Sequence, residues 1–156
     1  MKLSALSNLD IDAILRRQYP SFYRGTFSID NVPYTNLLDD NKCIVVCNLS
    51  KQGFYGTHFV TLVYNEGTLL YLDSLARPVQ EGFLTKFKPS VCYHLSEAIQ
   101  PPHSEACGYY CIFFTLYFNR VMRGQSVDFI VPFSTSHTLR NDDICWKNII
   151  MLQQAS

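Results

Sequence analysis

The segment from Cys107 to about Met122 constrains the fold more than any other part of the chain. Apolar residues recur all round this segment and not along one side only, which is typical of a buried helix. Such a helix needs other elements packed against every face. With 156 residues, 47% of them hydrophobic, the chain is long enough to enclose it in one core. We therefore expect a single domain over residues 1–156.

A β-hairpin is predicted in the middle of the chain. Two runs of strand-forming residues, His58–Asn65 and Thr68–Asp73, are separated only by Glu66-Gly67, which favours a hairpin with a two-residue turn. A polar loop with Gly53 and Gly56 precedes the first run. Further strands are expected at residues 42–49 and 91–95.

Helices are predicted on both sides of this hairpin in the sequence. They are expected over about 9–18, 79–87 and 142–152, with Asn8 and Asn141 as N-caps of the first and last. Residues 21–40 carry turn markers and are expected to be irregular. The fold class is therefore α+β: a small mixed or antiparallel sheet flanked by helices.

Charge and hydropathy exclude several classes of protein. There are 13 Lys and Arg against 13 Asp and Glu, which argues against a generally basic nucleic-acid binder. The longest uncharged apolar stretch, Ala106–Phe118, is shorter than the roughly 18 residues that a membrane span requires. No secretory signal is visible near the start. We expect an intracellular monomer that binds no membrane and binds nucleic acid weakly or not at all.

Six cysteines do not form a recognisable framework. Disulfide scaffolds belong to short secreted chains, and no CxxC pair that would suit zinc occurs, so no metal is expected. Four of the six are expected in the core, because free cysteine is often buried. These are Cys43, Cys47, Cys111 and Cys145.

Cys107 differs from them because it stands at the start of the long apolar helix. The N-terminus of a helix stabilises a thiolate through its macrodipole and its N–H groups. Gly108 follows and leaves the backbone there sterically open. Cys107 is therefore the candidate nucleophile, although for a cysteine considered alone the more usual interpretation is a small core residue at the start of a buried helix.

His58 and Asp73 are candidates for the base and the carboxylate that orients it. A two-residue turn at Glu66-Gly67 pairs Asn65 with Thr68 and places His58 and Asp73 diagonally on one face of the hairpin. A cysteine nucleophile needs such a histidine as general base and later acid. Each residue alone is also compatible with a strand end or a turn.

Gln100, seven residues before Cys107, is the fourth candidate. Its side-chain amide is suited to donate to an oxyanion, with the Cys107 backbone N–H as second donor. Pro101-Pro102 restricts the backbone directly after it. The alternative is a solvated loop glutamine.

The order His58, Asp73, Gln100, Cys107 resembles the cysteine proteases of the adenovirus endopeptidase (adenain) and SUMO-protease group. The segment Pro102-His-Ser-Glu-Ala-Cys-Gly108 is more similar to adenain, as are Phe22-Tyr-Arg-Gly-Thr-Phe27 and Thr138-Leu-Arg-Asn. Two features depart from that family. Phe59 follows the histidine where Trp is usual, and the acid is Asp73 where adenovirus enzymes often have Glu.

The resemblance implies an adenain-like cysteine protease fold and a Cys-His-Asp endopeptidase, with its buried central helix beginning at the nucleophile. Such an enzyme cleaves viral precursor proteins at Gly-containing sites during virion maturation, in the virion and in the nucleus or cytoplasm of the infected cell. The alternatives are a ubiquitin-like-specific (SUMO or ubiquitin) isopeptidase acting on host conjugates and a non-catalytic binding module with the same fold.

The resemblance also implies two activators. Cys92 stands at the place of the cysteine that links an activating peptide through a disulfide, and is equally compatible with an ordinary strand cysteine. DNA is the second activator in that family, but the zero net charge argues against strong binding. The basic residues available for it are Arg16, Arg17, Lys86, Lys88, Arg120 and Arg123.

Overall fold

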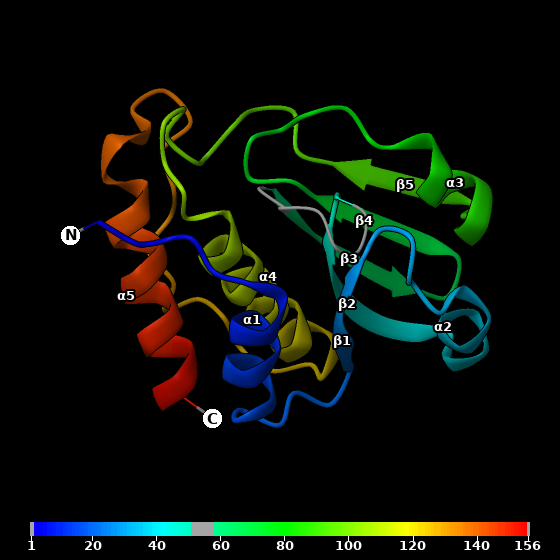
Figure 1. Ribbon diagram of the computed structural model, residues 1–156. Helices are drawn as coiled ribbons and strands as arrows, with labels where there is room; N and C mark the ends of the chain where they lie inside the picture. The colour runs from blue at the N-terminus through cyan, green and yellow to red at the C-terminus, as the bar shows by residue number, and fades with distance from the viewer. Residues whose placement is uncertain (1, 51–57, 156) are drawn as a thin grey trace.

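A computed structural model describes residues 2–50 and 58–155 (Figure 1). The loop that carries Gly53 and Gly56 lies outside the described residues. In chain order the elements are α1 (Asn8–Arg16), β1 (Tyr23–Ser28), α2 (Tyr34–Asp40), β2 (Lys42–Asn48), β3 (Phe59–Asn65), β4 (Thr68–Leu72), α3 (Glu81–Phe87), β5 (Val91–His94), α4 (Cys107–Met122), a 3₁₀ turn η1 (Thr138–Arg140) and α5 (Asn141–Gln154). The α+β class is confirmed.

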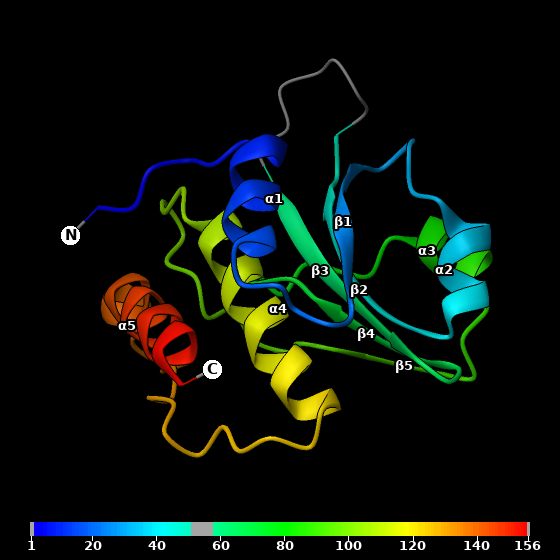
Figure 2. The ribbon, with the colours of Figure 1, turned by 90° about the horizontal axis from the view of Figure 1, so that it is seen from below.

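The five strands form one mixed sheet in the order β1-β2-β3-β4-β5. The inner strands β2, β3 and β4 are antiparallel, whereas β1 and β5 run parallel to their neighbours at the two edges. Helices cover both faces. Figure 2 shows α1, α4 and α5 on one side of the sheet and α2 and α3 on the other.

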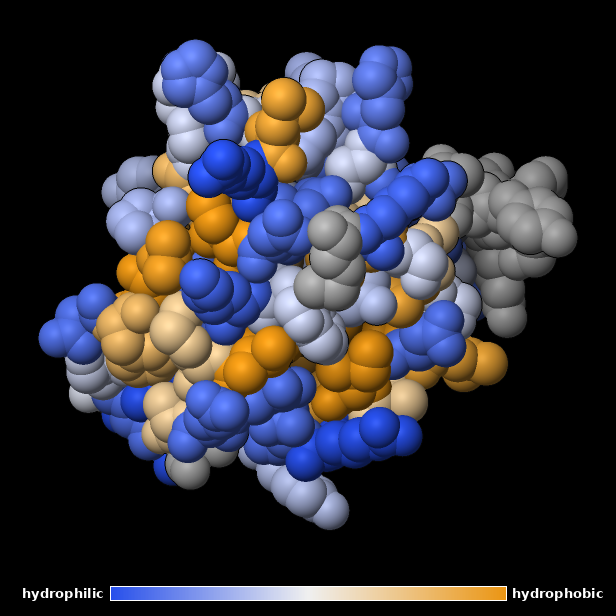
Figure 3. Space-filling model, turned by 90° about the vertical axis from the view of Figure 1, so that its left-hand side faces the viewer, coloured by the Kyte–Doolittle hydropathy of each residue, from blue (hydrophilic) through white to orange (hydrophobic). Residues whose placement is uncertain are grey.

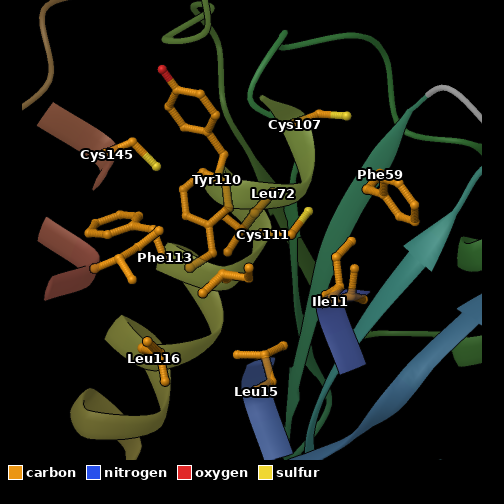
Figure 4. Close-up of a cluster of buried hydrophobic side chains, with 14 of the residues drawn as sticks. Ile11, Leu15, Phe59, Leu72, Cys107, Tyr110, Cys111, Phe113, Leu116 and Cys145 are labelled. Carbon is orange, nitrogen blue, oxygen red and sulfur yellow. The ribbon is translucent and has the colours of Figure 1, made fainter. Parts of the chain in front are cut away.

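Two hydrophobic cores follow from this arrangement, because successive side chains of a strand point to opposite faces. Ile44 and Val46 of β2 face α4, whereas Val45 packs on the α2 and α3 side. The helix α4 has ten buried residues and lies between the sheet, α1 and α5. Figure 4 shows Ile11 and Leu15 of α1 beside the side chains of α4, in the same buried cluster. The expectation of a buried central helix is confirmed.

The hairpin has the predicted register. Asn65 pairs with Thr68, and the turn residues Glu66 and Gly67 have φ angles of 48° and 89°. Positive φ at both central positions is the signature of a type I′ turn, whose twist matches that of the flanking strands. The last pair of the hairpin ladder is Thr61 with Leu72. Since β3 begins at Phe59 and β4 ends at Leu72, the residues directly beyond the two strands, His58 and Asp73, lie at the same end of the hairpin.

The segment 21–40 differs from its prediction, since it contains β1 and α2. The strand β1 was missed because its pairing with β2 is parallel and links distant residues. It also contains Gly25 with a φ of 141°, where a Cβ would approach the Phe27 ring to 2.8 Å. Glycine inside a strand sequence weakens the strand signal.

Both predicted N-caps are corrected by the structure. The cap of α1 is Ser7, one residue before Asn8: its hydroxyl accepts from the Asp10 N–H, and the Asp10 carboxylate accepts from the Ser7 N–H. This reciprocal capping box satisfies two backbone donors at once. At α5 the cap position is Arg140, and Asn141 is the first helical residue. The Asn141 side-chain amide is buried and donates to the backbone carbonyls of Ile99 and Ser134.

Gly108 has a packing role that differs from the expected open backbone. A Cβ at this position would lie 3.1 Å from both the Leu6 Cβ and the Ile11 Cδ1. The missing side chain therefore lets the N-terminal segment and α1 approach the first turn of α4 closely.

Within residues 2–50 and 58–155, no helix has the length and apolar character needed to cross a membrane. Figure 3 shows the face on the side of α5, where apolar groups are interspersed among hydrophilic side chains.

Candidate active site

His58 and Asp73 form a buried hydrogen-bonded pair at the end of the hairpin. The distance from His58 Nε2 to Asp73 Oδ1 is 2.7 Å, and the two residues are 6% and 2% exposed. Asp73 Oδ1 also accepts the backbone N–H of Leu75 at 2.8 Å. The pairing that the hairpin register predicted is therefore present.

Cys107 is the first residue of α4 and is buried. In Figure 4 its sulfur points from the helix toward the sheet. The Cys107 side chain interacts with the His58 imidazole and raises its pKa. Since Asp73 takes Nε2, the ring nitrogen left for the thiol is Nδ1. Three elements, β3, β4 and α4, thus bring together the thiol, the imidazole and the carboxylate.

The electrostatics of the pair favour a charged imidazole. Burial alone would lower the pKa of His58, but the hydrogen bonds to Asp73 and Cys107 and their negative charges outweigh it and raise the pKa to about 9. At neutral pH the ring is then an imidazolium next to the Asp73 carboxylate and the Cys107 sulfur. An imidazolium next to a cysteine stabilises the thiolate, which is the nucleophilic form.

Gln100 is also buried, with 2% of its surface exposed. Its Oε1 accepts from the Ser74 hydroxyl at 2.6 Å, and its Nε2 donates to the Ser104 carbonyl at 2.8 Å. The Gln100 backbone N–H donates to the Ser74 carbonyl at 3.0 Å. Gln100 is therefore not a solvated loop residue. It is anchored next to Asp73 by the residue that follows Asp73 in the chain.

The remaining cysteines fall into two groups. Cys43, Cys47, Cys111 and Cys145 are buried, as expected, and burial raises the pKa of each thiol, to about 11 for Cys43 and about 12 for Cys47. They stay neutral near pH 7. Cys92 is half-buried on the edge strand β5, and burial raises its pKa as well.

The remaining histidines and the aromatic residues of α4 lie outside the site. His94, His103 and His137 are exposed. Tyr110, Phe113 and Phe114 of α4 pack in the core.

The basic residues do not form one patch. Lys86 and Lys88 belong to α3 and the residue that follows it, on the opposite face of the sheet from α1 and α4. Arg16 pairs with Asp12, and Arg120 donates to the carbonyls of Ser126 and Ala155. The charges available to a DNA backbone are therefore divided between two faces.

A surface hollow of about 740 Å³ lies between α2 and α3. Its lining includes Tyr34, Leu38 and Lys86 but no cysteine or histidine. The hollow lies on the face of the sheet opposite α4 and is therefore not part of the site around Cys107.

Sequence reasoning missed two residues of the site, Ser74 and Ser104. Ser74 had a usable signal, since it follows Asp73 directly. Ser104 had no signal in the local sequence, because its role depends on a contact with a distant residue. Its hydroxyl donates to Asp142, 38 positions away, at 2.7 Å. Among the described residues, no group of three or more His, Cys, Asp and Glu is placed to hold a metal ion.

Comparison with known proteins identifies the fold. No family model and no curated protein matches the sequence. Two solved structures are similar over 97% of this chain. One is the SUMO protease Ulp1 with its catalytic cysteine oxidized to a sulfonic acid (19% identity, TM-score 0.49, 79% of that chain covered). The other is the C-terminal Ulp1 protease domain in complex with Smt3, the yeast ortholog of SUMO (16% identity, TM-score 0.50, 78% covered).

The second of these structures shows that the chain has a Ulp1-like cysteine protease fold. The resemblance to the adenain and SUMO-protease group is thereby confirmed at the level of the fold. At 16% identity the likeness extends no further than the fold.

Proposed function

We propose that this chain is a cysteine endopeptidase with Cys107 as nucleophile, His58 as base and acid, Asp73 as the carboxylate that orients His58, and Gln100 as oxyanion donor. One observation carries the proposal: the imidazole of His58 is hydrogen-bonded to Asp73 and interacts with the side chain of Cys107. Hydrolysis of a peptide bond by a cysteine nucleophile requires this arrangement of thiol, base and orienting carboxylate.

The proposed reaction begins with the Cys107 thiolate attacking the carbonyl carbon of the scissile peptide. The carbonyl oxygen becomes an oxyanion and accepts hydrogen bonds from the Gln100 amide and the Cys107 backbone N–H. His58 donates its proton to the leaving amine as the C–N bond breaks, which leaves a thioester. Water then attacks the thioester, His58 takes its proton, and the acid is released with the thiolate restored.

As substrates we propose viral precursor proteins, cleaved at Gly-containing sites during virion maturation in the particle or the infected cell. The residues that resemble adenain support this choice, above all Pro102-His-Ser-Glu-Ala-Cys-Gly108. Glycine suits a narrow approach to a buried nucleophile, because it has no side chain to clash, and Cys107 is only 5% exposed.

A second candidate is a ubiquitin-like-specific isopeptidase acting on host conjugates. It is favoured by the similar fold of the Ulp1 domain, whose structure holds Smt3, and by the Tyr71-Leu-Asp-Ser-Leu75 context of the acid.

The two candidates are separated by comparing two fluorogenic substrates. One is SUMO or ubiquitin with a C-terminal fluorophore, and the other is a short peptide with an internal glycine. An endopeptidase hydrolyses the peptide with a kcat/KM comparable to that for the modifier. Hydrolysis of the full modifier alone would favour the isopeptidase.

Cys107→Ala decides between an enzyme and a binding module with the same fold. Loss of all hydrolysis supports the enzyme, whereas hydrolysis equal to that of the unchanged chain would overturn the assignment of Cys107. Cys92→Ser serves as a control cysteine in assays without added peptide.

An activating peptide linked through Cys92 is a further proposal, supported by the position of Cys92 on an edge strand. An extended peptide can add a strand to such an edge. If a peptide is linked through Cys92, a cysteine-containing peptide should raise the activity of the unchanged chain but not that of the Cys92→Ser variant. Addition of DNA across a range of salt concentrations tests the second activator, for which we expect a weak effect.

A further inference from the structure

The side-chain amide of Gln100 is held by two groups of fixed polarity. The Ser104 carbonyl oxygen, 2.8 Å from Nε2, only accepts hydrogen bonds, so it requires the amide NH₂ on its side. The amide oxygen must then face Ser74, whose hydroxyl donates to it at 2.6 Å. The two contacts together define which way the amide points.

This orientation determines which hydrogens remain for a ligand. An amide NH₂ has two hydrogens, and the Ser104 carbonyl takes one of them. The other is the donor that an oxyanion would use. If the amide turned over, its oxygen would face the position of the oxyanion and would repel it. The value of Gln100 as a donor therefore depends on the group that holds its oxygen.

Ser74 is well placed to hold it. Its side chain is 1% exposed, and its carbonyl accepts the backbone N–H groups of both Ile99 and Gln100. It follows Asp73 in the chain, so neighbouring residues contact opposite halves of the site: Asp73 holds His58, and Ser74 holds Gln100.

We propose that Ser74 is a positioning residue for the oxyanion donor: its hydroxyl fixes the side-chain amide of Gln100 with one N–H directed at the oxyanion. The inference rests on the proposed cysteine peptidase function.

The other side of the amide is held through α5. Asp142, in the first turn of α5, accepts from the Ser104 hydroxyl at 2.7 Å and from the Tyr110 hydroxyl at 2.8 Å. The Ser104 hydroxyl also accepts the Ala106 N–H. These bonds fix the segment whose Ser104 carbonyl accepts from Gln100. Asp142 thus helps to hold the Gln100 amide without contacting it.

A double-mutant cycle on Ser74 and Gln100 tests the proposal. Gln100→Ala is expected to lower kcat by about 100-fold or more, the usual effect of removing one oxyanion donor. Ser74→Ala is expected to lower kcat by roughly three- to tenfold, which corresponds to the loss of one hydrogen bond. In the Gln100→Ala background, Ser74→Ala should change kcat by less than about twofold, because its effect passes through Gln100.

Two readouts separate positioning from a general loss of structure. A peptide aldehyde forms a tetrahedral adduct with the thiol, so its inhibition constant should rise in Ser74→Ala by about the same factor as kcat falls. The rate of Cys107 alkylation by iodoacetamide should not change, since the Ser74 hydroxyl donates to Gln100, whereas the His58 ring is held by Asp73. The matched control is Ser28→Ala, which removes a buried hydroxyl from β1 and should leave both readouts unchanged.

Equal effects of Ser74→Ala with and without Gln100 would overturn the proposal, as would an unchanged kcat in either single variant. If Ser74→Ala does not fold, Ser74→Cys has a side chain of similar size and a weaker donor, and the same cycle applies to it. Failure of the proposed function gives a different result, namely hydrolysis that persists in Cys107→Ala.

Discussion

One oxygen of Asp73 holds the His58 ring: Oδ1 accepts from Nε2 at 2.7 Å while also accepting the Leu75 N–H at 2.8 Å. The backbone bond fixes the carboxylate, and the carboxylate in turn fixes the imidazole. Both residues are buried, so the pair is shielded from solvent and salt. Because the pair is held in one arrangement, the protonation of His58 should affect both activity and stability, and both can be measured against pH.

The first prediction concerns the dependence of activity on pH. His58 must be protonated to donate to the leaving amine, and its pKa is raised to about 9. We expect kcat/KM to fall as the pH rises through about 9. Asp73→Asn removes the largest contribution that raises this pKa, so the decline should move to lower pH and the rate should fall by roughly 100-fold or more.

The matched control for this profile is Asp128→Asn, which changes an exposed carboxylate bonded to Ser126. Its pH profile should coincide with that of the unchanged chain. A profile of Asp73→Asn that also coincides would show that the carboxylate does not tune His58.

The second prediction concerns the stability of the fold. The pKa of His58 is raised from 6.5 to about 9 on folding, so the imidazolium stabilises the folded state fully below pH 6.5. That stabilisation is lost as the pH rises through 9, and it corresponds to about 3 kcal/mol in the free energy of unfolding. Urea unfolding at a series of pH values measures it. In His58→Ala the decline between pH 6.5 and 9 should be absent.

The third prediction concerns the selectivity of thiol chemistry. At pH 7 a limiting amount of iodoacetamide should label Cys107 before any other cysteine, because the proposed function makes Cys107 the nucleophile and His58 its base. Burial keeps the pKa of Cys43 near 11 and of Cys47 near 12. Peptide mass spectrometry identifies the labelled residue. Preferential labelling of Cys92, the half-buried cysteine, would contradict the proposed activation of Cys107.

The fourth prediction concerns the attachment of α5. Asn141 is fully buried, and its Nδ2 donates to the carbonyls of Ile99 and Ser134, each at 2.7 Å. Asn141→Asp replaces this donor by an oxygen of nearly the same size that faces both carbonyls. We expect a loss of about 3 kcal/mol in the free energy of unfolding. Asn36→Asp, the same change at an exposed residue of α2, should stay within about 0.5 kcal/mol.

The sequence allowed prediction of those parts of the molecule that depend on local patterns. The length of α4 follows from its apolar residues, and the hairpin register follows from Glu66-Gly67, whose positive φ angles suit a type I′ turn. The register in turn brings His58 and Asp73 together. Their catalytic roles, and those of Cys107 and Gln100, stay predictions.

What the sequence did not predict depends on contacts between distant residues. β1 forms only because β2 lies beside it in parallel, and Asn141 leaves the cap position because its amide bonds Ile99, 42 residues away. The capping box of α1 is the exception. It is local, and Ser7 with Asp10 could have been identified in place of Asn8.

The position of Cys107 on α4 links inactivation to unfolding. The sulfur is carried by the first turn of a helix whose remaining turns fill the space between the sheet, α1 and α5. The position of the thiol therefore depends on the packing of α4, since the backbone of Cys107 is continuous with the core. Heating should therefore abolish hydrolysis over the same temperature range in which the packing of the aromatic side chains is lost, with no inactive but folded state in between.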